Sequence, residues 1–473
     1  MVAPPTQLAW ETLFDLASVG GGPLHLRLTT AIRAAIRSGR LPLGAALPPT
    51  RTLAGQLGVS RWTVTEAYGQ LATEGYLLAR TGSATRVNWS PEPGEVRPVH
   101  RDRPPPPPAR YDMDPCRSDL RAFPRRRWVE AVRVAAETVP FQRLHYSAPG
   151  GDERLRDLIA EHLNRSRAAV ATAGTVSVFS GAGQAMLQVG RALYAAGYPA
   201  IGVEDPGSER LWQAARTAGL SLVGLPIDDD GLVVDALDGH PQLRVVCVGP
   251  AHQAATGCVL APHRRAALLA WARRVDGLVI EDDYDAEFSY TGPAPPVMQG
   301  TDPDRVVLLG SMSKTLGPAV GIGWVVTPGR WVDAVRSSHE VPLLPPMLNQ
   351  VALAHFMASG AYDRHLRASR IRFRNRRARL VKALEHRLPD YRIRGADGGL
   401  HVLLDLPPGT DAARVVAEAL REDVQVCDLD EMRLHPDPDA PALLLGYSNL
   451  TDPVVEDAIA VLASVIRKVA PAR

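Results

Sequence analysis

The chain is poor in cysteine and contains no long hydrophobic run. Four cysteines occur among 473 residues, and no two of them form a Cys-x-x-Cys pair. Because a structural zinc site needs closely spaced ligand pairs, this spacing excludes a zinc finger and predicts free thiols in a reducing compartment. No stretch reaches the roughly 18 apolar residues of a membrane span, and the N-terminal residues lack the basic and apolar regions of a secretory signal. We therefore expect a cytoplasmic protein.

Lysine is scarcer still. Only three of the 53 basic residues are lysines: Lys314, Lys382 and Lys468. A lysine inside a recognisable motif is therefore a stronger indication of function here than in an ordinary chain. Hydrophobic residues make up 45% and charged residues 22% of the sequence, proportions that exclude global disorder.

Charge is distributed unevenly along the chain. Residues 1–110 carry 12 arginines against seven acidic residues, whereas residues 111–473 carry 41 basic against 44 acidic residues. A proline-rich segment lies between the two parts, with eight prolines in residues 86–110, five of them consecutive. Consecutive prolines predict an extended spacer. We expect an N-terminal domain at 12–88, a linker at 89–110 and a larger domain at 111–473, with the basic domain suited to nucleic acid.

Two helices are predicted at the start of the N-terminal domain. Apolar residues recur every four positions from Leu28 to Ile36, which predicts an amphipathic helix that ends at Gly39. We expect Thr50 to cap a second helix and Gly58 to form the tight turn after it.

A third helix and a hairpin complete the pattern of a winged helix-turn-helix. We expect Ser60 to cap the helix and Arg61, Thr63 and Thr65 to face outward. Strand-like patterns on either side of Gly82 predict the wing. Arginine pairs with guanine and hydroxyls bind phosphate oxygens, so this face suits DNA. The alternative is a structural three-helix module with a solvated basic face.

A resemblance favours DNA binding. The segment LPPTRTLAGQLGVSRWTVTEAYGQLATEGYLLARTGSAT closely resembles the DNA-binding domain of GntR-type bacterial regulators, and the match extends over about residues 23–87. It implies double-stranded operator DNA as a partner. It also implies DNA contacts at Arg51, Ser60, Arg61, Thr63 and Gly82.

Helical and strand-like patterns alternate beyond the linker. The apolar strand candidates are residues 177–179, 200–203, 245–248, 278–280 and 306–309. Helical patterns separate them, for example at 154–163, 185–195 and 264–272. This alternation predicts an α/β fold with a mostly parallel sheet covered by helices on both faces.

Three short motifs follow predicted strands, where ligands bind in such folds. The small residues of Ser180–Gln184 lead into a helix, so a phosphate can approach its first amides. An acidic cluster occupies 281–285, and Ser311-Met312-Ser313-Lys314 follows the last strand. A metal site is disfavoured, because no glycine stands where a calcium loop needs one and no histidine lies within the cluster. We therefore expect no metal. The Ser-x-x-Lys motif of penicillin-binding enzymes is also disfavoured, because its Ser-Asp-Asn and Lys-Thr-Gly partners are missing.

A phosphate-binding turn, a carboxylate, a tyrosine and a lysine together suit pyridoxal 5'-phosphate. A lysine amine condenses with the cofactor's aldehyde, and a carboxylate pairs with its ring nitrogen. The turn and a serine hold the phosphate. The sequence therefore predicts a cofactor site formed by the three motifs.

The region from about Tyr111 to the C-terminus resembles fold-type I aminotransferases, and the two-part architecture resembles the MocR family of transcriptional regulators. The motifs that carry this resemblance are PAHQAATG (250–257), EDDYDAEF (281–288) and SMSKTL (311–316). The resemblance implies a smaller α+β subdomain over about 360–473 and a homodimer. It further implies that the large domain senses a small-molecule effector, either the cofactor or an amino compound.

The resemblance also implies roles for individual residues. Lys314 forms the Schiff base, Asp282 pairs with the pyridinium and Tyr284 contacts the ring hydroxyl. The implied phosphate contacts are Ala182, Gly183 and Ser311. Tyr146 is implied to reach across the dimer interface.

The sequence departs from the family pattern at three positions. Gly321 replaces a phosphate-binding arginine, Ser208 an aromatic that stacks on the cofactor, and Ala255 a proline. Loss of a charge-assisted phosphate contact costs about 1.5–3 kcal/mol. By resemblance to some members, Arg210 supplies a contact to the effector's carboxylate. The sequence leaves three functions open: a cofactor-dependent regulator, an aminotransferase with an accessory DNA-binding domain, and a regulator that no longer binds the cofactor.

Overall fold

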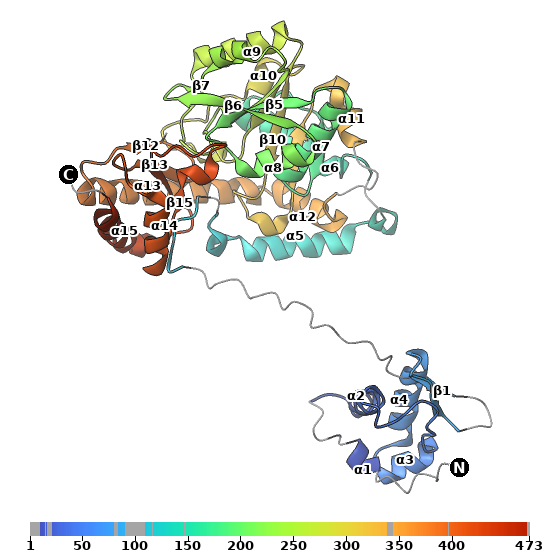
Figure 1. Cartoon of the computed structure of the whole chain (residues 1–473). Coiled ribbons are helices and arrows are strands. Elements are labelled where there is room, and N and C mark those ends of the chain that lie inside the picture. Colours follow the sequence, from blue (N-terminus) through green and yellow to red (C-terminus); the bar gives the residue numbers. More distant parts are fainter. Residues whose placement is uncertain are drawn as a thin grey trace. The chain divides into compact units, whose positions relative to one another are not determined.

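The computed structural model describes residues 10–14, 16, 21–79, 84–89, 109–115, 117–145, 148–337, 344–395 and 397–470. The chain divides into two compact units, residues 1–106 and 107–473, which are drawn in Figure 1. No helix in the described ranges is both long and apolar enough to cross a membrane.

The N-terminal unit consists of four helices and a two-stranded hairpin. Its elements are α1 (Trp10–Leu13), α2 (Leu24–Arg37), α3 (Thr50–Gln56), α4 (Arg61–Thr73), β1 (Leu77–Leu78) and β2 (Arg86–Val87). Helix α4 packs against both α2 and α3, and the two strands pair antiparallel. The predicted apolar stripe is confirmed, because Leu28, Ile32 and Ile36 are fully buried in the core of this unit.

Two of the three predicted helix signals in this unit are confirmed. The end of α2 lies at Arg37, just before Gly39. The Ser60 hydroxyl caps α4 by accepting a hydrogen bond from the N–H of Thr63 at 3.1 Å. The predicted N-cap at Thr50 is wrong by one residue: Pro49 occupies the N-cap position, and Thr50 is the first helical residue. The fixed φ of Pro49, −53°, with an extended ψ of 144°, explains the shift, because the chain enters the helix directly from the proline.

An eight-stranded sheet forms the centre of the large unit. Its strand order is β4-β11-β10-β9-β8-β5-β6-β7. The bounds are β4 (Val176–Phe179), β5 (Ala200–Asp205), β6 (Ser221–Asp228), β7 (Gly231–Leu232), β8 (Val245–Val248), β9 (Leu278–Asp282), β10 (Val306–Ser311) and β11 (Gly323–Val326). The five predicted strands are confirmed, each to within two residues at either end. Strands β10, β9, β8, β5 and β6 run parallel, whereas β11 is antiparallel to both of its neighbours.

Helices cover both faces of this sheet (Figure 1). They are α5 (Arg125–Thr138), α6 (Glu153–Arg167), α7 (Ala182–Ala195), α8 (Glu209–Thr217), α9 (Pro262–Arg274), α10 (Met298–Thr301), α11 (Val332–Arg336) and α12 (Met347–Ala358). Alternate residues of β10 point to opposite faces of the sheet. Val307 and Leu309 pack with α7 and α8 on one face, and Leu308 packs with α6 and α12 on the other. The predicted three-layer α/β arrangement is therefore confirmed.

A smaller antiparallel sheet, β12-β13-β16-β15, lies in the C-terminal part. Its elements are β12 (Ile393–Arg394), β13 (His401–Asp405), β15 (Cys427–Asp428) and β16 (Ala442–Gly446), with helices α13 (Ala361–Arg387), α14 (Ala412–Arg421) and α15 (Val455–Val469). Strand β14 (Val424–Gln425) pairs with β3 (Tyr111–Asp112), so the first strand after the proline-rich segment joins this part of the chain.

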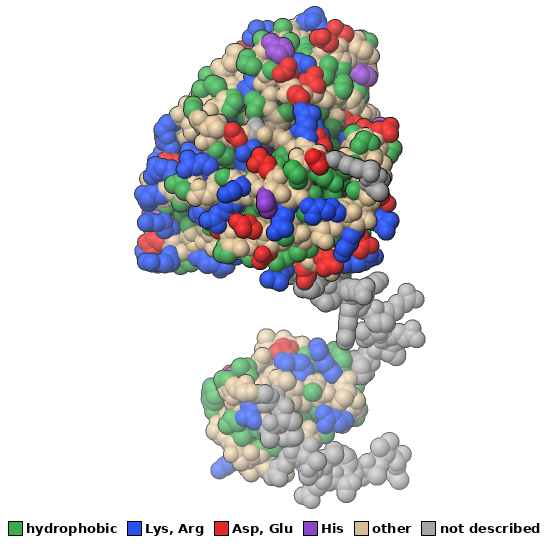
Figure 2. Space-filling model, turned by 90° about the vertical axis from the view of Figure 1, so that its left-hand side faces the viewer, with side chains coloured by type: hydrophobic (Ala, Val, Ile, Leu, Met, Phe, Trp, Pro, Cys, Tyr) green, Lys and Arg blue, Asp and Glu red, His purple; other side chains and the backbone are tan. Residues whose placement is uncertain are grey.

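Figure 2 shows many basic side chains on the face of the large unit formed by its C-terminal helices. Helix α13 contributes exposed basic residues along its whole length: Arg364, Arg367, Arg370, Arg374, Arg379, Lys382 and Arg387. Positive surface charge is therefore not confined to the N-terminal unit, although the large unit has more acidic than basic residues.

Candidate cofactor site and nucleic-acid interface

A cavity of about 180 Å³ lies beside the carboxyl ends of β9 and β10. It is lined by Pro115, Ala182, Ser208, Arg210, Leu211, Ala254, Asp282, Tyr284, Ser311, Ser313, Lys314, Pro318, His401 and Met432. Three strand ends, the start of α8 and strand β13 of the small sheet thus contribute to one space. The structure brings together the residues predicted from three separate motifs.

Two of the four acids in the 281–285 stretch have hydrogen-bond partners within the protein, and a third, Asp285, lies close to a histidine. Glu281 accepts hydrogen bonds from two main-chain N–H groups at the start of α10, at 3.0 and 3.1 Å. Asp283 forms a buried ion pair with Arg167 at 2.8 Å. The Oδ2 atom of Asp285 lies 3.0 Å from Nδ1 of His252. These acids stabilise the fold around the cavity.

Asp282 is the acid of this stretch that lines the cavity. Its side chain is 8% exposed, and its Oδ1 atom has no hydrogen-bond partner among the described residues. Burial, reinforced by the nearby charges of Asp285, Asp283 and Glu204, raises the pKa of Asp282 to about 8. A buried carboxyl that lines a cavity without a partner fits a cation placed in that cavity. The protonated ring nitrogen of a pyridine is a cation of this kind.

Tyr284 is oriented by a buried histidine. Its hydroxyl lies 2.9 Å from Nδ1 of His252. The His252 ring is 3% exposed, packs edge-to-face with His401 at 5.1 Å between centroids, and lies directly against Gly399. The sequence does not mark His252 as a functional residue, because nothing in the 250–257 motif indicates which later residue its ring contacts.

Lys314 lies in the turn that follows β10. Its Nζ atom is 3.5 Å from the carbonyl oxygen of Pro115, and its positive charge lowers the pKa of Asp282. Ser311 donates a hydrogen bond to the Ser313 hydroxyl at 2.9 Å and accepts one from the Ser313 N–H. Hydrogen bonds within the turn that carries Lys314 therefore stabilise its conformation.

Helix α13 holds the residue after the lysine. The Nε2 atom of His365 lies 2.7 Å from the carbonyl oxygen of Thr315, and the Tyr362 hydroxyl lies 3.4 Å from the Thr315 hydroxyl. Burial lowers the pKa of His365 below its ordinary value, so the neutral ring donates its N–H to Thr315. The backbone beside Lys314 is thereby tied to the helix that leads into the small sheet.

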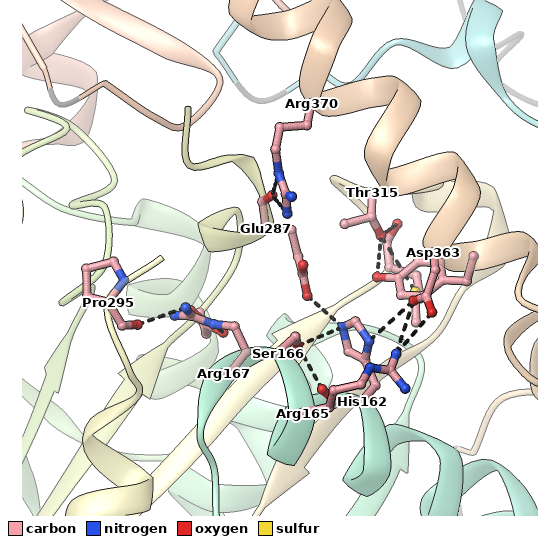
Figure 3. Close-up of polar contacts among 12 residues, drawn as sticks. His162, Arg165, Ser166, Arg167, Glu287, Pro295, Thr315, Asp363 and Arg370 are labelled. Carbon is pink, nitrogen blue, oxygen red and sulfur yellow. Dashed lines mark hydrogen bonds and ion pairs between the residues drawn. The ribbon is translucent and has the colours of Figure 1, made fainter. Parts of the chain in front are cut away.

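A polar network joins the same helix to α6 and to the segment after β9 (Figure 3). His162 Nε2 lies 2.7 Å from a carboxylate oxygen of Glu287. The guanidinium of Arg370 donates to the Glu287 carbonyl at 2.8 and 3.0 Å, and Arg165 pairs with Asp363 at 3.1 Å. These contacts fix the acidic stretch relative to α13.

The predicted phosphate turn leads directly into α7. Gly181 is the N-cap residue with φ of 126°, and the helix begins at Ala182. Gly323 of β11 passes so close that a Cβ atom there would lie 2.6 Å from the carbonyl carbon of Gly181. Glycine is thus required at both positions. The first N–H groups of α7 have no intrahelical acceptor and suit an anion.

Arg51, Ser60, Arg61 and Thr65 are exposed in the N-terminal unit. The prediction that Thr63 faces outward is wrong: it is 5% exposed, and its hydroxyl lies 2.9 Å from that of Ser60. Thr63 lies one helical turn before the buried Ala67, so it belongs to the inward face of α4.

Trp62 is a surface residue whose exposure the sequence does not predict. It is 61% exposed on α4 and packs edge-to-face with His25 at 5.4 Å. Tryptophan on a helix more often indicates a core position, so no pattern indicated its exposure. Gly82 and Tyr146, both predicted as site residues, lie outside the described residues.

Comparisons with known proteins match both units. Residues 24–87 match the family "Bacterial regulatory proteins, gntR family", and residues 116–456 match "Aminotransferase class I and II". The pyridoxine biosynthesis transcriptional regulator PdxR of Corynebacterium glutamicum is 36% identical over 385 residues, which cover 80% of this chain and 82% of that protein. The transcriptional regulator TauR of Rhodobacter capsulatus is 31% identical, covering 96% of this chain and 99% of that protein. MocR of Rhizobium meliloti is 30% identical, with 93% of each covered.

The chain belongs to the MocR-type regulators of the GntR family. This MocR-type regulator thus combines a GntR helix-turn-helix with an aminotransferase-like domain. Solved structures similar to its large unit include an archaeal alanine:glyoxylate aminotransferase, with 23% identity, a TM-score of 0.69 and coverage of 76% of this chain and 91% of that one. These structures support the predicted fold type.

The structure describes the three positions at which the sequence was expected to depart from the family pattern, Gly321, Ser208 and Ala255. Gly321 adopts a left-handed conformation, with φ of 65°, and a Cβ atom there would meet no described atom within 4 Å. Ser208 is the N-cap residue of α8 and lines the cavity. Ala255 is fully buried and packs with Leu403 and Leu429. The space around a Cβ atom at Gly321 is therefore open among the described residues.

Proposed function

We propose that this regulator binds pyridoxal 5'-phosphate through Lys314 and that occupancy of the site changes the affinity of its helix-turn-helix for operator DNA. The occupant is either the cofactor alone or the cofactor together with an amino compound. The observation that carries the proposal is the buried, unpartnered Oδ1 atom of Asp282 in the same cavity as the lysine.

The residues around the cavity fit distinct parts of the cofactor. Asp282 would pair with the ring nitrogen, and Tyr284, oriented by His252, would donate to the ring hydroxyl. The first amides of α7, at Ala182 and Gly183, would bind the phosphate together with the Ser311 hydroxyl. When bound, the cofactor supplies an aldehyde that forms a covalent bond with a primary amine.

The proposed coupling between site and fold follows the hydrogen bond between Thr315 and His365. A change in the position of Lys314 moves the adjacent Thr315 carbonyl, and α13 is bonded to that carbonyl. Helix α13 leads into the small sheet and carries the network of Figure 3. A ligand shifts this arrangement by its difference in affinity for two positions of α13.

Operator DNA is the proposed partner of the N-terminal unit. Regulators of the GntR family bind operators, and Arg51 and Arg61 are exposed near the starts of α3 and α4. The recognition helix presents its N-terminal residues to the major groove in this class of domain. Trp62, exposed beside Arg61, adds apolar area to the same end of the helix.

A homodimer is supported by exposed apolar residues around α5 and α12, two helices that pack together. These residues are Leu120, Val129, Val132, Phe141, Leu144 and Leu348. Contiguous exposed apolar surface indicates a protein interface. We expect Phe141→Asp to lower the molar mass measured by light scattering from dimer toward monomer. An unchanged mass would place the interface elsewhere.

The experiment that tests cofactor binding is a visible-absorption titration of the full-length protein with pyridoxal 5'-phosphate. We expect a saturable band in the wild type that is absent from Lys314→Ala and retained in the matched control Lys382→Ala, which alters an exposed lysine of α13. A band that persists in Lys314→Ala would contradict the assignment of the lysine. Absence of any band in the wild type would favour a regulator without cofactor. Steady turnover of an amino donor and a keto acid would instead favour an aminotransferase.

A further inference from the structure

The proposed cofactor brings a phosphate group that carries close to two negative charges near neutral pH. The start of a helix offers only about half a positive charge. At position 321, where the resemblance to aminotransferases implies an arginine, this chain has a glycine without a side chain. The cavity must therefore obtain a cation from another residue if the phosphate is to bind tightly.

Three basic residues line the cavity: Arg210, Lys314 and His401. Lys314 is assigned to the aldehyde end of the cofactor. Burial, with the nearby His252 and Lys314, holds the pKa of His401 well below its ordinary value, so its ring is neutral. Arg210 is the remaining permanent cation.

The geometry places Arg210 at the phosphate turn. A Cβ atom built on Gly183 would lie 3.4 Å from Nε and 3.8 Å from Cγ of Arg210. The arginine side chain thus runs across the second residue of α7, where the helix presents its unbonded N–H groups. At these distances Arg210 is in van der Waals contact range of the start of α7.

The guanidinium of Arg210 is exposed, and no hydrogen bond or ion pair joins it to another described residue. Arg216, on the same helix, instead pairs with Glu209 at 3.0 Å. The two arginines of α8 therefore differ: one is held by a neighbour on its own helix, and the other is available to a ligand.

We propose that Arg210 binds the phosphate of the cofactor and replaces the arginine that is missing at Gly321. This inference rests on the proposed cofactor binding and assigns Arg210 to the phosphate instead of an effector's carboxylate. A guanidinium donates two parallel hydrogen bonds to a phosphate, so the contact selects the phosphorylated form of the cofactor.

The test compares pyridoxal 5'-phosphate with pyridoxal, which lacks only the phosphate. Dissociation constants are measured by absorbance titration for the full-length wild type, Arg210→Ala and the control Arg216→Ala. We expect Arg210→Ala to weaken pyridoxal 5'-phosphate binding by about 10- to 100-fold, the range for a charge-assisted hydrogen bond, and pyridoxal binding by less than about twofold. Arg216→Ala is expected to change neither value. Thermal unfolding of each variant verifies that it remains folded.

Three other outcomes would contradict the inference, and each has a different meaning. An equal loss for both ligands would show that Arg210 supports the site structurally. Unchanged cofactor affinity, with weaker binding of an amino acid to the loaded protein, would assign Arg210 to an effector carboxylate. Absence of wild-type binding would contradict the proposed function itself, and this inference with it.

A second variant tests the same inference from the other direction. Because a Cβ atom at Gly321 meets no described atom within 4 Å, an arginine can be built there, at the cost of a left-handed backbone. In the Arg210→Ala background, Gly321→Arg is expected to restore at least part of the preference for the phosphorylated ligand. Failure of Arg210→Ala to lose that preference would overturn the inference regardless of the rescue.

Discussion

The Nδ1 atom of His252 lies 2.9 Å from the hydroxyl oxygen of Tyr284. The same ring rests against Gly399, which lies between β12 and β13 of the small sheet, so this part of the chain supports a side chain of the cavity. A Cβ atom at Gly399 would lie 2.0 Å from Cε1 of His252. The position of Tyr284 therefore depends on a residue that is more than 100 positions later in the chain.

Gly399→Ala is expected to displace the His252 ring. The added methyl group overlaps the ring, and its backbone has φ of 73°, so we expect a loss of about 1–3 kcal/mol in the free energy of unfolding and weaker cofactor binding. Gly409→Ala is the matched control, since φ there is 79° but the space around a Cβ is open among described residues. Urea unfolding and absorbance titration measure both effects. Equal effects of the two substitutions would contradict the contact.

Asp282→Asn is expected to affect the free energy of unfolding and the cofactor affinity in different ways. Burial raises the pKa of Asp282 from 3.8 to about 8, so between these values the folded cofactor-free protein keeps a proton that the unfolded chain releases. The contribution of Asp282 to folding stability therefore falls as pH rises from about 4 to 8. The substitution removes this contribution.

We accordingly expect the unfolding free energy of Asp282→Asn, relative to that of the cofactor-free wild type, to increase from pH 5 to pH 8. Cofactor affinity is expected to fall, because the amide cannot neutralise a pyridinium. Urea titrations at several pH values measure the first effect, and absorbance the second. Parallel pH profiles would show that Asp282 is not a buried acid of raised pKa.

Arg51→Ala and Arg61→Ala are expected to weaken operator binding. Each lost phosphate contact lowers the slope of log affinity against log salt by about one, whereas a lost base contact costs about 1–3 kcal/mol and relaxes sequence preference. Arg33→Ala is the control, because Arg33 pairs with Glu74 at the opposite end of α4. Fluorescence anisotropy over a range of salt concentrations distinguishes the two kinds of contact. Operator binding that survives both substitutions would remove these arginines from the interface.

His365→Ala is expected to reduce the effect of the cofactor on DNA affinity more than it reduces cofactor affinity. The variant loses the 2.7 Å contact to the Thr315 carbonyl but no group that lines the cavity. We expect cofactor affinity to change by less than about threefold, while the cofactor-dependent change in DNA affinity shrinks. His386→Ala, at the exposed end of the same helix, is the control. If His365→Ala retains the full cofactor-dependent change, the signal does not pass through this bond.

The sequence predicted the parallel strands β5, β8, β9 and β10, because runs such as Val245–Val248 are apolar on both faces, as buried strands must be. It did not predict the parallel strand β6, whose residues are mostly only half-buried or exposed. It did not predict β11, a Gly-Trp-Val-Val strand that enters the sheet antiparallel between β4 and β10. Its place depends on Gly323, which lets the strand pass the turn at Gly181. Such a close approach is a tertiary fact that has no local pattern.

For the site, too, the sequence could not predict tertiary contacts, as the acidic stretch at 281–285 shows. Four adjacent acids look equivalent in the sequence, and only their partners separate them. Asp283 pairs with Arg167, from a distant element, whereas Asp282 lines the cavity and retains an unpartnered oxygen. Likewise, Arg210 meets Gly183 only because α7 and α8 pack side by side.

The decisive measurement is DNA affinity with and without saturating pyridoxal 5'-phosphate, for the wild type and for Lys314→Ala. The probe is a duplex selected from random sequence by the wild-type protein, and fluorescence anisotropy at fixed salt gives the dissociation constants. We expect the cofactor to change the affinity of the wild type and to leave that of Lys314→Ala unchanged. Identical responses of the two proteins would contradict a regulator whose DNA binding depends on cofactor held by Lys314.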